Sequence, residues 1–294
     1  MELYRAECLG AGVRARGPEG YRMKIRAGYT ISYDCPQPTP MILQVSVHPS
    51  RQADLISWDG LQIDPAIPAN TYHDTFGNFC HVIRAPAGRL TLSTDFMVQD
   101  SGELDPVVPD AAQHPLEELP VDALIFLLGS RYCETDRLSD FAWSTFGRLP
   151  KGWPLVQAIC DFAHQRIKFG YEHASPTKTA FDAYTEQRGV CRDYAHLAIT
   201  LCRCMNVPAR YCTGYLGDMG TPKPWAAGDF AAWFEAYLGG RWHIFDPRNN
   251  VPRLGRILMA RGRDATDVAM VTSFGPCKLV DFKVVTDEVP SVAA

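Results

Sequence analysis

The sequence predicts an α+β fold, and three observations support this prediction. Residues 23–99 form short segments of alternating apolar and polar residues, interrupted by Gly, Pro, Asn and Asp, which is typical of an antiparallel β domain. Segments with helical periodicity follow from about residue 138, and further strand-like segments come after those helices. A block of strands, then helices, then antiparallel strands is the order of an α+β protein.

The chain divides into five parts on composition and periodicity. We expect a tail over 1–22, the antiparallel β domain over 23–99, an acidic Pro-rich linker over 100–118, a core over 119–274, and a C-terminal strand and tail over 275–294. The core holds helical patterns over 138–146, 153–167 and 190–205. Two strands joined by Gly239-Gly240 follow them.

Composition excludes several classes of function. The net charge of -4 and pI near 6.1 argue against nucleic acid or an anionic membrane as the main partner. The sequence has no apolar run long enough to span a bilayer and no apolar signal-peptide region near its start, so cytoplasmic residence is the default expectation. Ten cysteines without any C-x-x-C pair are expected to be free thiols, with no metal, no calcium loop and no cofactor. The oligomeric state is not predicted.

Cys191 is the candidate nucleophile. It follows Gly189 at the expected start of a helix, where unsatisfied N–H groups and the positive end of the dipole stabilise a thiolate. The same N–H groups can face an oxyanion during acyl transfer. A buried structural cysteine is an equally weighted interpretation when this segment is considered alone.

The hairpin around Gly239-Gly240 sets the geometry of the other candidates. A two-residue turn pairs Leu238 with Arg241 and Trp233 with Asp246, so Ala231 and Asp246 become diagonal neighbours on one face. A His at 231 would reach both Asp246 and a cysteine packed over that face, but the residue is Ala. Trp233 shares this face, as do Tyr237 and Trp242, and we expect the face to pack on the helix of Cys191 rather than to form a substrate platform.

No other histidine is a clear base. His243 is expected on the opposite face of the hairpin, and His196 lies on another side of the Cys191 helix, where a structural hydrogen bond is expected. His164 and His173 precede that helix and have no obvious orienting partner.

Four motifs in order carry a family resemblance. They are "GVCRD", "PARYCTGY", "AAWFEAYL" and "FDPRN". With these motifs, residues 119–274 resemble the bacterial transglutaminase-like cysteine peptidase family, and residues 23–98 are similar to its N-terminal domain. The resemblance implies a papain-like, transglutaminase-like core, in which the nucleophile helix packs on an antiparallel sheet.

The resemblance also implies roles for single residues. Acyl transfer through a thioester would use Cys191 as the nucleophile and Asp246 as the acid that orients a His, and Ala231 stands at the position of that His. Gln187 is implied as an oxyanion-hole residue, although a role in capping a helix end is just as compatible with its position. The implied partner is a peptide or protein with an amide acyl donor.

Three hypotheses remain open at this stage. The chain is a weak cysteine peptidase or amidase that uses Cys191, a pseudoenzyme that binds a peptide or an amine, or an inactive variant of an active cysteine peptidase in which Ala231 is an engineered substitution for His. The substrate, and the choice between hydrolysis and transamidation, are not predicted.

Overall fold

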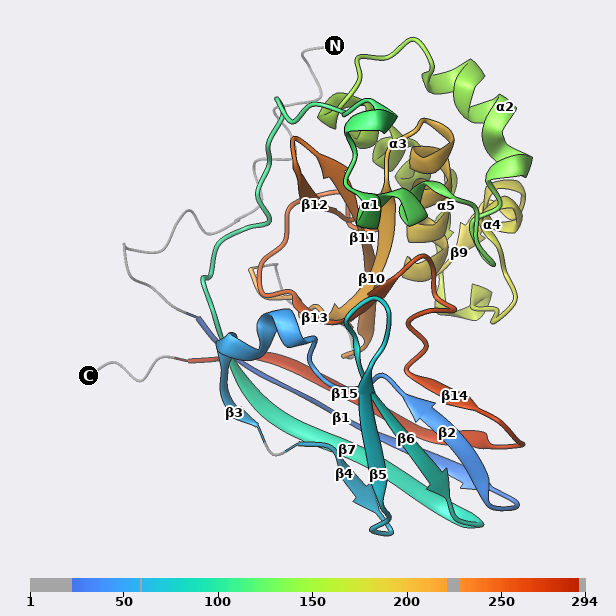
Figure 1. Ribbon diagram of the computed structural model, residues 1–294. Coiled ribbons are helices and arrows are strands. Elements are labelled where there is room, and N and C mark those ends of the chain that lie inside the picture. Colours follow the sequence, from blue (N-terminus) through green and yellow to red (C-terminus); the bar gives the residue numbers. More distant parts are fainter. Residues whose placement is uncertain (1–22, 59, 221–227, 291–294) are drawn as a thin grey trace.

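The computed structural model describes residues 23–58, 60–220 and 228–290; the predicted tail over 1–22 lies outside these residues. Two parts lie one above the other in Figure 1. The upper part carries the helices around an antiparallel sheet, and the lower part consists of antiparallel strands. The predicted α+β fold is confirmed.

The lower part contains two sheets. Within the described residues, one sheet has the order β15-β1-β7-β3, with β4 also paired to β7, and the other has the order β14-β2-β6-β5. The strands are β1 (Met23–Cys35), β2 (Thr39–Leu43), β3 (Leu55–Trp58), β4 (Gln62–Asp64), β5 (Ala69–His73), β6 (Phe79–Ala85), β7 (Gly88–Asp100), β14 (Val271–Ser273) and β15 (Lys278–Val289).

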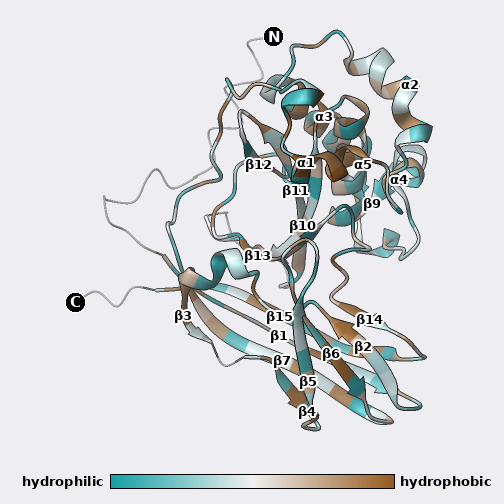
Figure 2. Cartoon of the chain, viewed as in Figure 1, coloured by the Kyte–Doolittle hydropathy of each residue, from teal (hydrophilic) through white to brown (hydrophobic). Residues whose placement is uncertain are grey.

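The alternating sequence of these strands explains their packing. Met23, Ile25 and Ala27 of β1 are buried, whereas Lys24 and Arg26 between them are exposed. Figure 2 shows hydrophilic and hydrophobic segments alternating along the lower strands. Strands β1, β2, β6 and β7 therefore each bury one face in a shared core, whereas β5 is exposed along its length.

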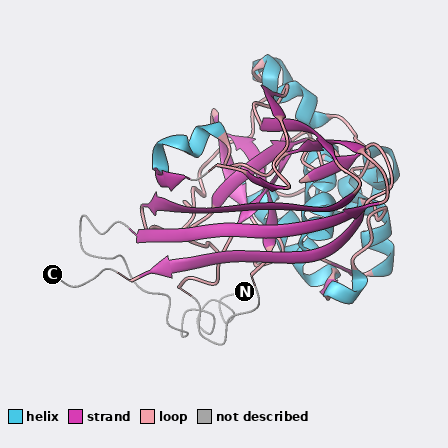
Figure 3. Cartoon of the chain, turned by 90° about the horizontal axis from the view of Figure 1, so that it is seen from below, coloured by secondary structure: helices cyan, strands magenta, loops and turns pink. Residues whose placement is uncertain are grey.

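The C-terminal strand completes the sheet that the first strand begins. β15 pairs antiparallel with β1 over almost its whole length, for example Val284 with Tyr29, and it runs along the outer margin of the sheet when the molecule is seen from below (Figure 3). A disulfide joins Cys35 at the end of β1 to Cys277 just before β15. The expectation of free thiols is therefore wrong for these two cysteines, which are far apart in sequence but meet at the same end of two paired strands.

The upper part is built on a sheet of order β12-β11-β10-β13. Its strands are β10 (Ala209–Tyr215), β11 (Phe230–Leu238), β12 (Arg241–Phe245) and β13 (Ile257–Gly262), and β8 (Lys168–Phe169) and β9 (Arg188–Gly189) form a short parallel pair. The helices are α1 (Val121–Leu124), α2 (Thr135–Phe146), α3 (Trp153–Arg166), α4 (Ala180–Glu186) and α5 (Cys191–Cys204), with short 3-10 turns at Leu116–Glu118, Ile125–Leu127 and Tyr171–His173; a further 3-10 turn, Pro49–Asp54, precedes β3 in the lower part.

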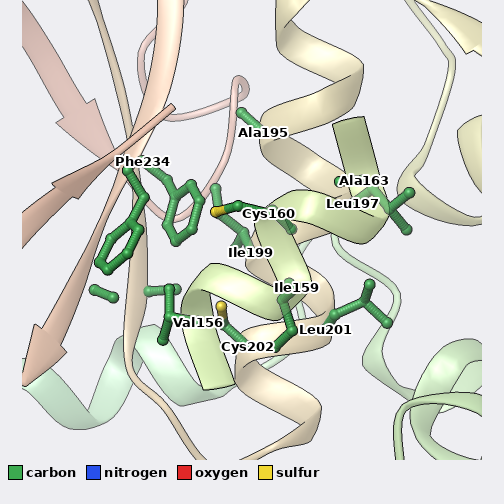
Figure 4. Close-up of a cluster of buried hydrophobic side chains, with 14 of the residues drawn as sticks. Val156, Ile159, Cys160, Ala163, Ala195, Leu197, Ile199, Leu201, Cys202 and Phe234 are labelled. Carbon is green, nitrogen blue, oxygen red and sulfur yellow. The ribbon is translucent and has the colours of Figure 1, made fainter. Parts of the chain in front are cut away.

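Helix α5 is the centre of the upper core. Its residues from Asp193 to Cys204 are all buried. Figure 4 shows Ile199 and Leu201 of α5 beside Val156 and Ile159 of α3, with Phe234 of β11 against them. Each fully buried aliphatic side chain contributes about 1.5–3 kcal/mol relative to an exposed one, so α3 and the sheet together fix α5 and its first residue.

The expected linker over 100–118 lies packed against the upper part. Ala111 is buried and its carbonyl accepts the Trp153 N–H, while the Asp105 N–H donates to the Arg253 carbonyl.

Among the described helices, none is both long and apolar enough to cross a membrane.

Candidate active site

Cys191 is the first residue of α5, as the sequence predicts. The Asp193 carboxylate turns back and accepts the Val190 N–H at 2.9 Å, which caps the helix start. A Cβ atom at Gly189 would lie 2.5 Å from that carboxylate, so only glycine fits there. The nucleophile candidate is thus held at a helix N-terminus by a turn that requires both Gly189 and Asp193.

The thiol of Cys191 lies where strands β11 and β12 part. The hairpin ladder begins at Leu238 and Arg241, as predicted for the Gly239-Gly240 turn, and its last pair joins Phe234 to Phe245. Burial raises the pKa of the Cys191 thiol to about 11, although hydrogen bonding from the Ala232 backbone lowers it. The thiol is therefore protonated at neutral pH.

Ala231 and Cys191 line the same cavity of about 250 Å³. Asp229 and Tyr171 also line it, and the Tyr171 hydroxyl lowers the pKa of the Asp229 carboxyl, in opposition to burial. Burial raises the pKa of Asp229, and the Asp229 charge in turn raises the pKa of Cys191. The methyl group of Ala231 thus faces a cavity with a thiol and a carboxyl group and, among the described residues, with no imidazole on its wall.

Asp246 is buried and does not line this cavity. It is 8 % exposed. Its carboxylate accepts from the Asn249 N–H at 3.0 Å, from the Asn249 amide at 2.7 Å and from the Arg256 guanidinium at 2.8 Å. Burial alone would raise the pKa of Asp246, but the Arg256 charge and the Asn249 hydrogen bonds hold it below its ordinary value. Asp246 is an ionised acid whose oxygens already have partners.

The structure corrects the predicted packing of the hairpin. Ala232, Phe234 and Ala236 face α5 in the main core, whereas Trp233 packs with Cys212 and Leu258 on the opposite face. The expectation that the face of Ala231, Trp233, Tyr237 and Trp242 packs on the nucleophile helix is therefore wrong. Strand alternation separates the two faces correctly, but it does not say which face a helix covers.

The other side of the hairpin is closed by the segment that follows β7. The Trp242 ring lies 5.3 Å from the Phe126 ring, and the Tyr237 ring lies 5.9 Å from the His114 ring. Arg210 pairs with Glu235 at 2.6 Å and stacks 4.1 Å from the Trp242 ring. These aromatic residues form a packed interface.

Gln187 is not brought to the cavity. It ends α4 with a positive φ of 57°, its side chain is exposed, and its carbonyl accepts the Lys168 N–H. The structure therefore favours the helix-end alternative for Gln187, and the oxyanion role stays a prediction.

The remaining histidines of the core are engaged elsewhere. His243 lies on the face opposite Asp246 and bonds the Leu238 carbonyl, as the predicted register requires. His196 is fully buried and accepts the Ala265 N–H, and burial lowers its pKa to about 3. His164 bonds the Pro247 carbonyl at 3.1 Å, and His173 lies 3.5 Å from the Glu172 carboxylate. None of these four lines the cavity of Cys191.

Three further cavity residues escaped the sequence analysis. Asp229 directly precedes β11, and Tyr171 lies in a short 3-10 turn far from it in sequence. Arg248 follows the F-D-P motif and stacks on Phe169 at 4.5 Å. Of these three, only Asp229 could have been found from the sequence, because it lies two residues before Ala231.

Within the described residues no group of three or more His, Cys, Asp or Glu side chains is placed to hold a metal ion.

Comparisons with known proteins agree with this geometry. Residues 148–247 match the model of the transglutaminase-like superfamily. An uncharacterized protein of Mycobacterium tuberculosis H37Rv is 32% identical over 238 residues, which is 71% of this chain and 73% of the relative. An uncharacterized protein of Mycobacterium leprae is 28% identical over 230 residues, which is 70% of this chain and 75% of the relative.

A solved structure extends the likeness to nearly the whole chain. The crystal structure named "Putative Cysteine Protease from Cytophaga hutchinsonii" superposes with a TM-score of 0.78 and 31% identity. The match covers 94% of this chain and 93% of that chain, so both the lower strands and the upper core are included.

Proposed function

Because the chain belongs to the transglutaminase-like superfamily, we propose that it is a cysteine peptidase- or amidase-type scaffold for acyl transfer through Cys191, with activity strongly impaired by Ala231. The observation that carries this proposal is the cavity of about 250 Å³ whose wall includes both Cys191 and Ala231.

The proposed reaction explains why the residue at 231 matters. The sulfur of Cys191 would bond the carbonyl carbon of an amide, the C–N bond would break, and the amine would leave with a proton. The thioester would then pass its acyl group to water or to an amine. The first step needs a group that takes the thiol proton and delivers it to the leaving amine. The second needs a group that takes a proton from the attacking water or amine and returns it to the sulfur. Both are tasks of the missing imidazole.

The electrostatics of the cavity agree with impaired activity. A thiol with a pKa of about 11 is almost entirely protonated at neutral pH, and it is the thiolate that attacks. In the superfamily arrangement an imidazolium beside the sulfur would stabilise that thiolate. Loss of the base from such a triad costs on the order of 10⁴- to 10⁶-fold in rate.

A second candidate function is a binding module for a peptide or an amine. It is favoured by the open cavity of about 250 Å³, which keeps Asp229, Tyr171 and Arg248 on its wall although the base is absent. Such a cavity can bind a short peptide segment without chemistry. Under either candidate the partner is a peptide or protein with an amide group.

Turnover separates the two candidates. The chain, its Ala231→His variant and the Ala231→His variant that also carries Cys191→Ser would be incubated with a panel of fluorogenic peptide amides. We expect release of the amine by Ala231→His only, at a rate that Cys191→Ser abolishes. Saturable peptide binding by the chain, with no Cys191-dependent turnover by Ala231→His, would support the binding module instead.

A further inference from the structure

The partner of Asp246 is itself a buried charge. Arg256, the residue before β13, has a side chain that is only 4% exposed. Its Nη2 atom donates to Asp246 at 2.8 Å, and its Nε atom lies 2.9 Å from the Asp105 carboxylate. One guanidinium thus joins two carboxylates, and a buried cation with two such partners is more strongly held than a single surface pair.

Aromatic stacking fixes the plane of this guanidinium. The Arg256 carbon Cζ lies 5.1 Å from the Trp233 ring, which is on the same face of the hairpin as Ala231. The Arg256 carbonyl also accepts from the Arg51 side chain at 2.8 Å. Arg256 is therefore held by Trp233 of the upper sheet on one side and by Arg51 of the lower part of the molecule on the other.

Asp105 comes from the segment that leaves β7. Its carboxylate, 12% exposed, also accepts the Arg253 N–H at 2.9 Å, and its own N–H donates to the Arg253 carbonyl at 2.7 Å. These backbone bonds hold Asp105 against the loop between Asp246 and β13. The segment expected as a linker thus brings a fixed carboxylate to the site.

We propose that Arg256 is the positioning residue of the site: anchored by Asp105 and stacked on Trp233, it fixes the Asp246 carboxylate on the face of the hairpin that carries Ala231. This inference rests on the proposed function for its catalytic meaning. Arg256 keeps Asp246 charged and sets its orientation, so that a His at 231 would find an ionised and immobile acceptor. Asp105 makes this arrangement depend on the junction between the two parts of the molecule.

The first test uses the chain as it is and needs no catalysis. The titration of the Asp246 carboxyl carbon would be followed by NMR in protein labelled at aspartate, with Asp246→Asn to assign the signal. The groups that face Asp246 are the Arg256 cation, the neutral Asn249 amide, and the Cys160 and Cys191 thiols. Burial favours the neutral carboxyl, so Arg256→Gln should move the pKa of Asp246 from below to above its ordinary value.

The chain offers a matched control on the same face of the sheet. Arg210 also stacks on a tryptophan and pairs with one carboxylate, Glu235. Arg210→Gln should leave the pKa of Asp246 in place, and Arg256→Lys, which keeps the charge, should keep it low even if Arg256→Gln does not fold. An Asp246 pKa that stays below its ordinary value in Arg256→Gln would overturn the inference.

The second test measures the positioning role of Arg256 in the Ala231→His background. The measured quantity is the rate at which iodoacetamide labels Cys191. Arg256→Gln should slow labelling about tenfold, a coupling of the size seen between contacting residues. The same change on top of Asp246→Asn should alter the rate less than twofold. If Arg256→Gln slows the labelling of Cys191 equally with and without the Asp246 carboxylate, the role of Arg256 is merely structural.

The two tests separate this inference from the proposed function. Failure of Ala231→His to activate Cys191 would contradict the proposed function, whereas the titration of Asp246 would still decide whether Arg256 controls that acid.

Discussion

Replacing Ala231 by His adds an imidazole to the cavity that the Cys191 thiol lines. With a pKa of about 11, about one thiol in 10⁴ is ionised at pH 7. Thiols paired with His have pKa values of roughly 3.5 to 7.5, which would make about a quarter or more of the sulfur thiolate. The ionised fraction would then rise by roughly 2,000- to 10,000-fold.

The intrinsic reactivity of the thiolate falls as its pKa falls. With a Brønsted coefficient of about 0.45, a pKa lowered by roughly 3.5 to 7.5 units slows each thiolate about 40- to 2,000-fold. The two effects together predict that iodoacetamide labels Cys191 roughly 5- to 60-fold faster in Ala231→His than in the chain as it is. Mass spectrometry of the peptide that contains Cys191 would measure the rate separately from the buried thiols.

Two controls make this measurement decisive. Ala231→Gln adds a side chain of similar bulk without a titrating group and should label no faster than the parent chain. Asp246→Asn in the His background should remove most of the gain, because the imidazolium loses its acceptor. Equal labelling of the parent chain and Ala231→His, with both folded, would refute the reasoning.

Three further predictions concern the same elements. Because the pKa of Cys191 is raised to about 11, its labelling rate in the parent chain should still be rising through pH 10; a plateau below pH 9 in a pH series would contradict the assigned environment. Gly189→Ala places a Cβ atom 2.5 Å from the Asp193 carboxylate and should lower the free energy of unfolding in urea by about 1–3 kcal/mol; unchanged stability would show that the turn relaxes. Replacing Cys35 and Cys277 by Ser should lower the free energy of unfolding by about 2–5 kcal/mol. It should also abolish the effect of a reductant on the melting temperature. If a reductant lowers the melting temperature of both proteins equally, its effect does not come from this disulfide.

Local patterns in the sequence predicted the hairpin and the nucleophile helix well. Gly239 and Gly240 have φ values of 57° and 81°, which is why this pair sets a two-residue turn and the register of β11 and β12. The apolar stripe after Gly189 predicted α5, since almost every residue of that helix is buried. These features depend on neighbours in sequence.

Contacts between distant segments were not predictable in the same way. The face of the hairpin that α5 covers depends on how helices and sheets are layered, and the pairing of Cys35 with Cys277 depends on the return of β15 to β1. The salt bridge of Asp105 with Arg256 lies in a segment whose composition indicates only a linker. The cytoplasmic location rests on default reasoning and stays an expectation.

The formation of a thioester on Cys191 tests the central claim most directly. The parent chain and Ala231→His would be mixed with a peptide amide, and the intact protein mass would be followed for an acyl adduct that neutral hydroxylamine removes. We predict an adduct on Cys191 in Ala231→His and none in the parent chain on the same timescale. An adduct that forms on Cys191 equally fast in both proteins would contradict the claim that the residue at 231 is what the site lacks.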